Sequence, residues 1–294
     1  MDVTNMASKR MRTVINIAVS LLFILSILLL LFPIMSARYS EKTRSRIISQ
    51  YTEALSLSED TTVQDIYDSA VEYNSKLYDR KIDATTPEGL ETAGYFSQLS
   101  VNGQDMMGYL HIPKLNVTAP IYHGTGEASM SRGVGHMPQS SLPVGGLNTH
   151  TVLSAHSGMA GFPGFSDLEL LNLGDVFYID VLGKTLTYEV YDIQTVLPDN
   201  IAPVQIQDDE DLCTLITCVP FGINTHRLLV TGRRIQATTV NGISAVSTDT
   251  STEHHASSSI WLKNYFKAIA IGAVIALGIS AIVCCVFAWR KRHI

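Results

Sequence analysis

Two long uncharged segments near the ends of the chain limit the folds that are open to it. Residues 13–37 and 268–289 contain no Asp, Glu, Lys or Arg. An α-helix needs about 20 apolar residues to cross the hydrocarbon core of a bilayer, and both segments are long enough. They also explain why the mean hydropathy is +0.17 and only 16% of the residues are charged. We therefore predict two transmembrane helices with one domain of ordinary size between them.

Basic residues lie on the outer side of each apolar segment. The sequence KRMR at residues 9–12 precedes the first segment, and RKR at residues 290–292 follows the second. By the positive-inside rule both termini are cytoplasmic, so the domain between them faces outward. A cleavable signal peptide is the alternative for the N-terminus, because MSA at residues 35–37 resembles a cleavage site. The length of the segment, and the charged, helix-like stretch directly after it, favour a retained signal-anchor.

Changes in composition divide the chain into seven parts. They are a cytoplasmic N-terminus (1–12), a transmembrane signal-anchor (13–37), a helical segment with a loop (38–100), a β-rich domain (101–236), a Ser/Thr-rich linker (237–262), a C-terminal transmembrane helix (263–289) and a basic cytoplasmic tail (290–294). In the third part, apolar residues recur at three-to-four spacing, which predicts helices from Ser40 to about Asp83. A break at 56–61 separates two of them, and Asp60-Thr61-Thr62 is a candidate N-cap for the second.

Short strand-like runs follow one another from residue 108 to residue 235, separated by turn residues. Gly183 lies between two such runs and predicts a hairpin. Residues 165–173 carry an apolar pattern that fits one or two helical turns. Many short strands with one embedded helix are typical of a closed β-barrel. The predicted fold class is therefore mainly β, with the N-terminal helices lying on a closed barrel.

The cysteines, the metal-ligand patterns and the net charge exclude several classes of site. Cys284 and Cys285 lie in the second apolar segment, which leaves Cys213 and Cys218 in the β-rich domain. Five residues apart on one strand, these two point to opposite faces and cannot bridge each other. There is no Cys-x-x-Cys or His-Glu-x-x-His pattern, so we expect no metal and no cofactor. A net charge of −6 offers no basic footprint for nucleic acid.

The sequence DLCTLITCVPFGINTHR at residues 211–227 contains the strongest candidate for chemistry. An apolar strand ends on Cys218, a loop of Pro, Gly and Asn follows at 220–224, and a second strand opens with Arg227. If the loop folds the chain back, the thiol lies beside the guanidinium at an exposed strand end. Such a pair can act as a nucleophile with an oxyanion partner. The alternative is a buried structural cysteine and a surface arginine, because free cysteines are often buried.

A histidine upstream favours the catalytic alternative. His156 follows a strand-like run in the sequence LSAHSG at residues 153–158. A cysteine enzyme needs a histidine that is close in space, although it can be distant in sequence. His150 shares the same strand face, so it is the one serious rival for the role of base. We expect structural roles for the remaining candidates in the domain, which are His111, His123, His136 and His226.

Several motifs, taken together, resemble those of the sortases, the membrane-anchored cysteine transpeptidases of Gram-positive bacteria. They are GYLHIPKLNVTAPIYHGT (108–125), SLPVGG (141–146), LSAHSG (153–158), TLITC (214–218) and GINTHRLLVTGRR (222–234). The details are most similar to the class C sortases, which polymerise pilins. The resemblance covers residues 108–235 and implies an eight-stranded barrel for the catalytic domain at 101–236.

The resemblance also implies the reaction and its partners. An LPXTG-like sorting signal on a pilin or surface protein would be cleaved between Thr and Gly. Cys218 is then the nucleophile that forms an acyl-thioester, His156 the general acid and base, and Arg227 the group that stabilises the oxyanion and substrate. The acceptor would be a pilin lysine, or a cell-wall precursor amine in a housekeeping role. Two further alternatives are a peptidase that uses water as acceptor and a non-catalytic assembly module.

Class C sortases carry a lid with an Asp-Pro-aromatic motif that plugs the active site. In this chain the corresponding lid-like loop is residues 81–91, and it contains Ala-Thr-Thr-Pro at 84–87 with no aromatic residue after the proline. The nearest acid is Asp83. We therefore predict that the usual lid anchor is missing or replaced, with Asp79 and Tyr78 as the candidates for a replacement.

Overall fold

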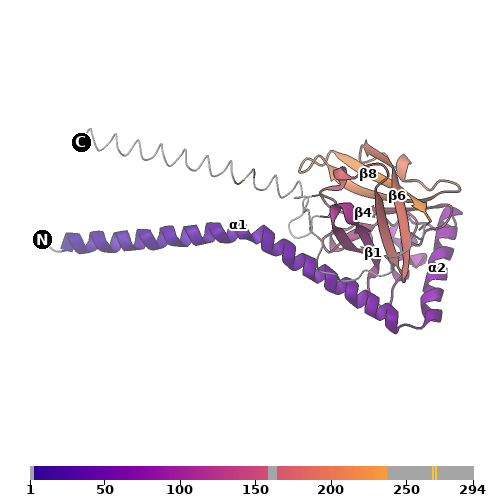
Figure 1. Cartoon of the computed structure of the whole chain (residues 1–294), viewed down its shortest axis with the longest axis horizontal. Helices are drawn as coiled ribbons and strands as arrows, with labels where there is room; N and C mark the ends of the chain where they lie inside the picture. Colours follow the sequence, from indigo (N-terminus) through magenta and orange to yellow (C-terminus); the bar gives the residue numbers. More distant parts are fainter. Residues whose placement is uncertain (1–2, 158–163, 237–266, 268, 270–294) are drawn as a thin grey trace.

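The computed structural model describes residues 3–157, 164–236, 267 and 269 (Figure 1). Its N-terminal part is helical, with α1 (Val3–Leu57), α2 (Asp60–Tyr78) and α3 (Pro87–Thr92). The predicted break between two helices is confirmed, because α1 ends and α2 begins inside residues 56–61. The predicted cap was wrong. The N-cap is Glu59, which makes no side-chain capping bond, and Asp60 is already helical. An acid in the first turn still interacts favourably with the helix dipole.

The structure confirms neither of the two predicted membrane spans. In the part of the chain that the structure describes, no helix has the length and hydropathy needed to cross a bilayer. The second span and the parts next to it, at 237–262 and 290–294, lie almost entirely outside the described residues. Both spans therefore stay predictions.

Eight strands form a closed barrel in the order β1-β2-β3-β4-β7-β8-β6-β5. Their bounds are β1 (Met106–Ile112), β2 (Val117–His123), β3 (Val134–His136), β4 (Thr149–Ser154), β5 (Val176–Val181), β6 (Lys184–Val196), β7 (Asp211–Val219) and β8 (His226–Ile235). Two pairs, β2 with β3 and β4 with β7, are parallel, and the other pairs are antiparallel. The predicted mainly β fold with a closed eight-stranded barrel and N-terminal helices is confirmed.

One short helical turn, η1 (Tyr95–Ser97), precedes the barrel, and others lie in its connections: η2 (Pro113–Leu115), α4 (Glu127–Met130), η3 (Leu168–Leu170) and η4 (Ala202–Val204). The predicted turn within residues 165–173 is η3. The predicted hairpin joins β5 to β6, with Val181 opposite Lys184. Its two loop residues, Leu182 and Gly183, both have positive φ, as a tight hairpin of this hand requires.

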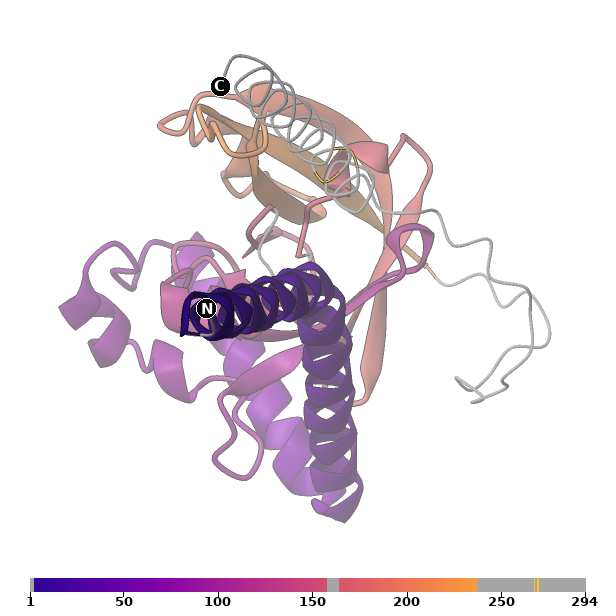
Figure 2. The same ribbon diagram turned by 90° about the vertical axis from the view of Figure 1, so that its left-hand side faces the viewer.

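The N-terminal helices lie against the barrel through buried polar contacts. Figure 1 shows α2 along the flank of the barrel opposite the side from which α1 leaves, and Figure 2 shows the indigo and violet helices grouped on one side of the orange strands. Tyr51 of α1 is only 1% exposed, and its hydroxyl donates to the Met107 carbonyl and accepts from the Leu182 amide. In α2, Asn74 exchanges hydrogen bonds with the backbone of Leu142 in both directions.

Alternation along β7 and β8 creates two separate apolar clusters. Cys213, Leu215 and Val230 point into the main core, inside the barrel. Residues of the opposite strand face form a small second cluster outside, made of Val152, Ile216 and Leu229, with Met137, Val196 and Val204 packed against it. Because side chains alternate along a strand, Cys218 shares the outer face with Ile216. The candidate site therefore lies on the outside of the barrel wall, where β4, β7 and β8 meet.

Candidate active site

The β7–β8 hairpin brings the predicted thiol and guanidinium together. Cys218 and Arg227 are direct cross-strand partners in the antiparallel ladder. The connecting loop is closed by bonds from the Ile223 and Asn224 amides to the Pro220 carbonyl, 3.0 Å each. Gly222 and Asn224 have positive φ, which glycine and asparagine tolerate best. The loop composition noted in the sequence therefore explains the tight reversal that sets this register.

Parallel pairing of β4 with β7 brings His156 to the same end of the barrel. Ser154, the last residue of β4, lies opposite Ile216, so His156 and Cys218 each follow their strand pair by two residues. Two hydrogen bonds continue the contact between the two segments: the Ala155 amide donates to the Ile216 carbonyl, and the Ser157 side chain donates through Oγ to the Cys218 carbonyl at 2.8 Å. The His156 side chain is 34% exposed and so remains open to solvent.

The two cysteines of the domain have opposite environments. Cys213 is completely buried inside the barrel, and burial raises the pKa of its thiol well above the ordinary value. A thiolate there would be strongly disfavoured. Cys218 is half-buried at the strand end, and both thiols are free. The surroundings of the two residues favour Cys218 as the reactive one.

Arg227 is held in place by its own loop. Its Nη1 donates to the carbonyls of Asn224 and His226, 3.0 Å each. Among the described residues, its Nε and Nη2 donors have no protein partner. Arginine presents five N–H donors in a rigid fork, so the remaining ones can bind an oxygen that approaches Cys218.

Glu127, a residue that the sequence analysis did not single out, contacts the candidate histidine. It is the first residue of α4, and its Oε2 lies 3.3 Å from His156 Nε2. The two residues are 29 positions apart, and α4 has only four residues. A helix so short has no periodic signal, so nothing in the sequence pattern pointed to this contact.

The structure separates His156 from its rival. The ring of His150 is fully buried near the start of β4, beside Leu212 rather than Cys218. Its Nδ1 bonds to the Gln205 carbonyl at 2.8 Å, and its Nε2 bonds to Thr214 Oγ1 at 2.7 Å. Burial lowers the pKa of this imidazole. Both nitrogens are therefore engaged away from the site.

The other histidines of the domain have local partners. The His136 ring bonds to the Tyr95 hydroxyl and the Ser141 carbonyl, and burial lowers its pKa to about 4. His123, His111 and His226 bond to Gln98, Thr118 and Thr225 respectively. These contacts agree with the structural roles expected for them. Within the described ranges, no group of three or more His, Cys, Asp or Glu side chains could hold a metal ion.

The lid-like loop at 81–91 is folded onto itself. The Asp83 carboxylate accepts from the Thr85 amide and from the hydroxyls of Thr85 and Thr86, and these bonds lower its pKa to about 2. The two replacement candidates bond elsewhere, Tyr78 to Asp208 and Asp79 to Lys81. In the part of the chain that the structure describes, no hydrogen bond or ion pair joins residues 78–91 to Cys218, His156 or Arg227.

Comparison with known proteins gives one family. A family model described as the sortase domain matches residues 110–235. The crystal structure of sortase C1 from Streptococcus agalactiae is 38% identical with a TM-score of 0.62, and the match covers 65% of this chain and 98% of that chain. The structure of Clostridium perfringens sortase C with the C-terminal cell wall sorting motif is 42% identical with a TM-score of 0.58, covering 65% and 99%.

Curated relatives match over shorter stretches. Sortase A of Streptococcus agalactiae serotype III (strain NEM316) is 27% identical over 140 residues, which is 46% of this chain and 56% of the relative. Sortase D of Bacillus subtilis (strain 168) is 30% identical over 131 residues, or 44% and 63%. The chain thus matches less than two thirds of the length of either curated relative.

The barrel, the site geometry and these matches define the class of protein. The chain belongs to the sortase family, whose members are cysteine transpeptidases. Within that family it is similar to the class C sortases, such as those of Streptococcus agalactiae and Clostridium perfringens.

Proposed function

We propose that this chain is a cysteine transpeptidase that exchanges a peptide bond through a thioester on Cys218. The observation that carries the proposal is the cross-strand pairing of Cys218 with Arg227, beside the strand β4 that ends two residues before His156. A thiol, an imidazole and a guanidinium at one exposed strand end are what such a reaction needs.

In the first half-reaction the Cys218 thiolate attacks the carbonyl carbon of the scissile Thr–Gly bond. The carbonyl oxygen becomes an oxyanion, which the guanidinium of Arg227 stabilises. The C–N bond then breaks while the His156 imidazolium gives its proton to the departing glycine amine. The products are an acyl-thioester on Cys218, a neutral imidazole on His156 and a free amine.

In the second half-reaction the acceptor amine attacks the thioester carbonyl. His156 takes the proton that this amine loses, and the C–S bond breaks to restore the Cys218 thiolate. The new bond is an amide, so the energy of the original peptide bond is conserved and no cofactor is needed.

The substrate that we propose is an LPXTG-like sorting signal bound on the outer face of the barrel. Met137, Val196 and Val204 are partly buried, pack against the buried cluster of Val152, Ile216 and Leu229, and give this face an apolar floor. Beside it, Leu197 and Ile201 of the β6–β7 connection are each 62% exposed. An extended peptide can place apolar side chains on such a floor, with its carbonyls toward Arg227. The related Clostridium perfringens structure was determined with a C-terminal cell wall sorting motif.

We propose a pilin lysine as the acceptor, in line with the class C relatives. A cell-wall precursor amine is the second candidate, and one observation favours it. Residues 84–87 replace the lid motif, and the loop makes no polar contact with the site within the described residues. A loop that makes no polar contact with the site fits a broader choice of acceptor.

We further propose that the protein is anchored in the cell membrane by residues 13–37 and 263–289, with both termini in the cytoplasm. The helix α1 continues without interruption from residue 3 to residue 57, and its C-terminal part packs on the barrel through Tyr51. A continuous helix of this kind would fix the height of the site above the membrane surface.

The experiment that tests the proposed function supplies the full-length protein, in detergent micelles, with an LPXTG-type peptide and one acceptor at a time. The acceptors are a lysine-bearing pilin fragment, a cell-wall peptide amine and water alone. We expect a ligated product with the pilin fragment, and none with Cys218→Ala. A product with only the wall peptide would support the housekeeping role. Hydrolysis alone would indicate a peptidase, and an active Cys218→Ala variant would overturn the mechanism.

A further inference from the structure

We infer that Glu127 is a positioning residue for His156, held in place by an anchored α4. This inference rests on the proposed function, because it assigns His156 the proton transfers. The observation is the contact of 3.3 Å between Glu127 Oε2 and His156 Nε2. A carboxylate that orients a catalytic imidazole is a recurring arrangement among enzymes that use nucleophilic side chains.

The contact decides which ring nitrogen does the chemistry. An ionised carboxylate can only accept hydrogen bonds, so the His156 nitrogen that faces it must carry a proton. Nε2 therefore stays protonated whether the ring is neutral or charged. The nitrogen left for exchange with the leaving and incoming amines is Nδ1.

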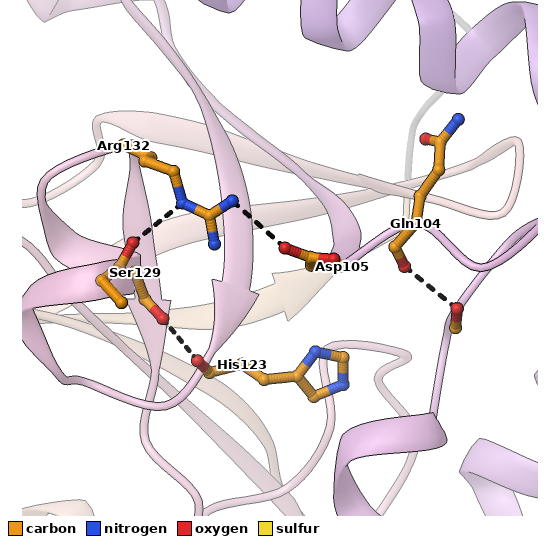
Figure 3. Close-up of polar contacts among 7 residues, drawn as sticks. Gln104, Asp105, His123, Ser129 and Arg132 are labelled. Atoms are coloured by element: carbon orange, nitrogen blue, oxygen red, sulfur yellow. Dashed lines mark hydrogen bonds and ion pairs between the residues drawn. The ribbon is translucent and has the colours of Figure 1, made fainter.

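The position of Glu127 is determined by the anchoring of α4, and Figure 3 shows the polar contacts of Ser129 and Arg132 that provide this anchor. Ser129 Oγ donates to the His123 carbonyl at 2.6 Å. Arg132 Nε donates to the Ala128 carbonyl at 2.8 Å, and Arg132 Nη1 pairs with Asp105 Oδ2 at 3.1 Å. A helix of four residues is not stable on its own, so these bonds must keep α4 in place.

Packing reinforces the same anchor. The guanidinium of Arg132 lies 4.2 Å from the centre of the Tyr122 ring, and Ser129 and Met130 are buried. The guanidinium of Arg132 pairs with the carboxylate of Asp105 and not with that of Glu127. Among the described residues, the Glu127 carboxylate is therefore available to pair with His156.

The exposure of Glu127 limits the size of the effect. Its side chain is 76% exposed, and exposed ion pairs contribute little to folding. Removing the carboxylate should therefore leave thermal stability unchanged while His156 spends less time in the productive orientation. We expect the rate of acylation to fall about two- to fivefold, the size of an exposed ion-pair interaction.

The test compares single-turnover formation of the Cys218 thioester in the full-length protein and its variants. Glu127→Gln should slow acylation, and Glu127→Asp should recover part of the rate because it keeps the charge. Glu53→Gln removes the same charge from an exposed site on α1 and is the matched control. Salt should slow the wild type more than Glu127→Gln, because salt screens the ion pair. Equal rates in wild type and Glu127→Gln at all salt concentrations would refute the inference.

A double variant separates positioning from general structural support. If Arg132 acts by holding Glu127, then Arg132→Ala slows acylation, but it adds no further loss to Glu127→Gln. Additive losses would show that Arg132 supports the site in another way and would contradict the anchored-α4 part of the inference.

A readout without turnover keeps the inference separate from the proposed function. With ¹⁵N-labelled histidine, the Nε2–H proton of His156 should give a hydrogen-bonded NMR signal in the wild type and lose it in Glu127→Ala, which has no side-chain acceptor. An intact signal in Glu127→Ala would contradict the inference even if the protein proves inactive. A protein that shows the expected signal change but forms no thioester would instead refute the proposed function.

Discussion

Cys213 and Cys218 lie on the same strand, yet one is enclosed in the barrel and the other lies at its rim. We expect a small alkylating reagent to modify Cys218 in the folded protein and to leave Cys213 unmodified, because the buried thiol has a raised pKa and no access to solvent. Peptide mapping by mass spectrometry after a short exposure measures this. Modification of Cys213 at a similar rate in folded protein would contradict the assignment.

Arg227 is expected to act on the developing oxyanion, so its loss should affect the rate more than folding. Arg227→Ala should slow thioester formation by roughly 100- to 1000-fold, the usual cost of removing one oxyanion donor. Arg227→Lys should restore only part of the rate, because an ammonium lacks the planar fork. Quenched-flow measurement of acylation gives both numbers. A fully active Arg227→Lys variant would show that charge alone is sufficient.

At the same scale, some residues of the site could be predicted from sequence and others could not. The pairing of Cys218 with Arg227 follows from a tight Pro/Gly/Asn loop between two alternating strands, which is local information. The placement of His156 depends on parallel pairing between β4 and β7, which are separated by more than fifty residues. The resemblance to a known family supplied that placement. Glu127 was missed, because its contact arises from the fold of a connection.

Among the elements, η1 is joined to β3 by a buried polar contact to an ionisable ring. The hydroxyl of Tyr95 in η1 lies 2.8 Å from His136 Nδ1, and the imidazole is completely buried. Its pKa is lowered from 6.5 to about 4 by burial. Between these values the unfolded chain binds a proton that the folded chain does not. The free energy of unfolding should therefore fall as pH is lowered from 6.5 to 4, by roughly 3 kcal/mol from this residue.

Denaturant titrations at pH 7, 5.5 and 4.5 test this expectation. His123 and His150 also have pKa values lowered by burial, so they contribute in the same direction. The half-buried carboxyls of Asp180 and Asp211 have pKa values raised by desolvation and oppose it. His136→Asn removes one ionisable ring, so its stability should vary less with pH than that of the wild type. The same pH dependence in both proteins would contradict the lowered pKa of His136.

The elements themselves were predicted with different success. Alternation and turn residues identified the β5–β6 hairpin and the longer strands, because those signals are local, but not β3, which has only three residues. The predicted N-cap of α2 was wrong. A run of Asp and Thr offers several capping positions, and the N-cap is Glu59, one residue before that run. The turn in the lid-like loop also has local causes, because Asp83 accepts three hydrogen bonds from the residues just after it. Whether this loop contacts the site depends on how the helices pack on the barrel, which local sequence signals do not give.

For the whole molecule, the proposed membrane anchoring predicts a distinct behaviour in cells. The full-length protein should stay in the membrane fraction after extraction with alkaline carbonate, because a spanning helix is not released by charge or pH. Protease added to intact protoplasts should degrade the barrel domain, since it faces outward by the positive-inside rule. Release by carbonate would contradict the anchors, and protection of the domain from protease would contradict the orientation.

The measurement that tests the central claim most directly is the intact mass of the enzyme after brief exposure to an LPXTG-type peptide. The account predicts an added mass equal to the acyl fragment that ends in threonine, present in the wild type and in Cys213→Ala. It also predicts that the adduct is absent in Cys218→Ala and strongly reduced in His156→Ala and Arg227→Ala. An adduct that persists in Cys218→Ala, or one lost in Cys213→Ala with folding intact, would contradict the claim that Cys218 is the nucleophile at this strand end.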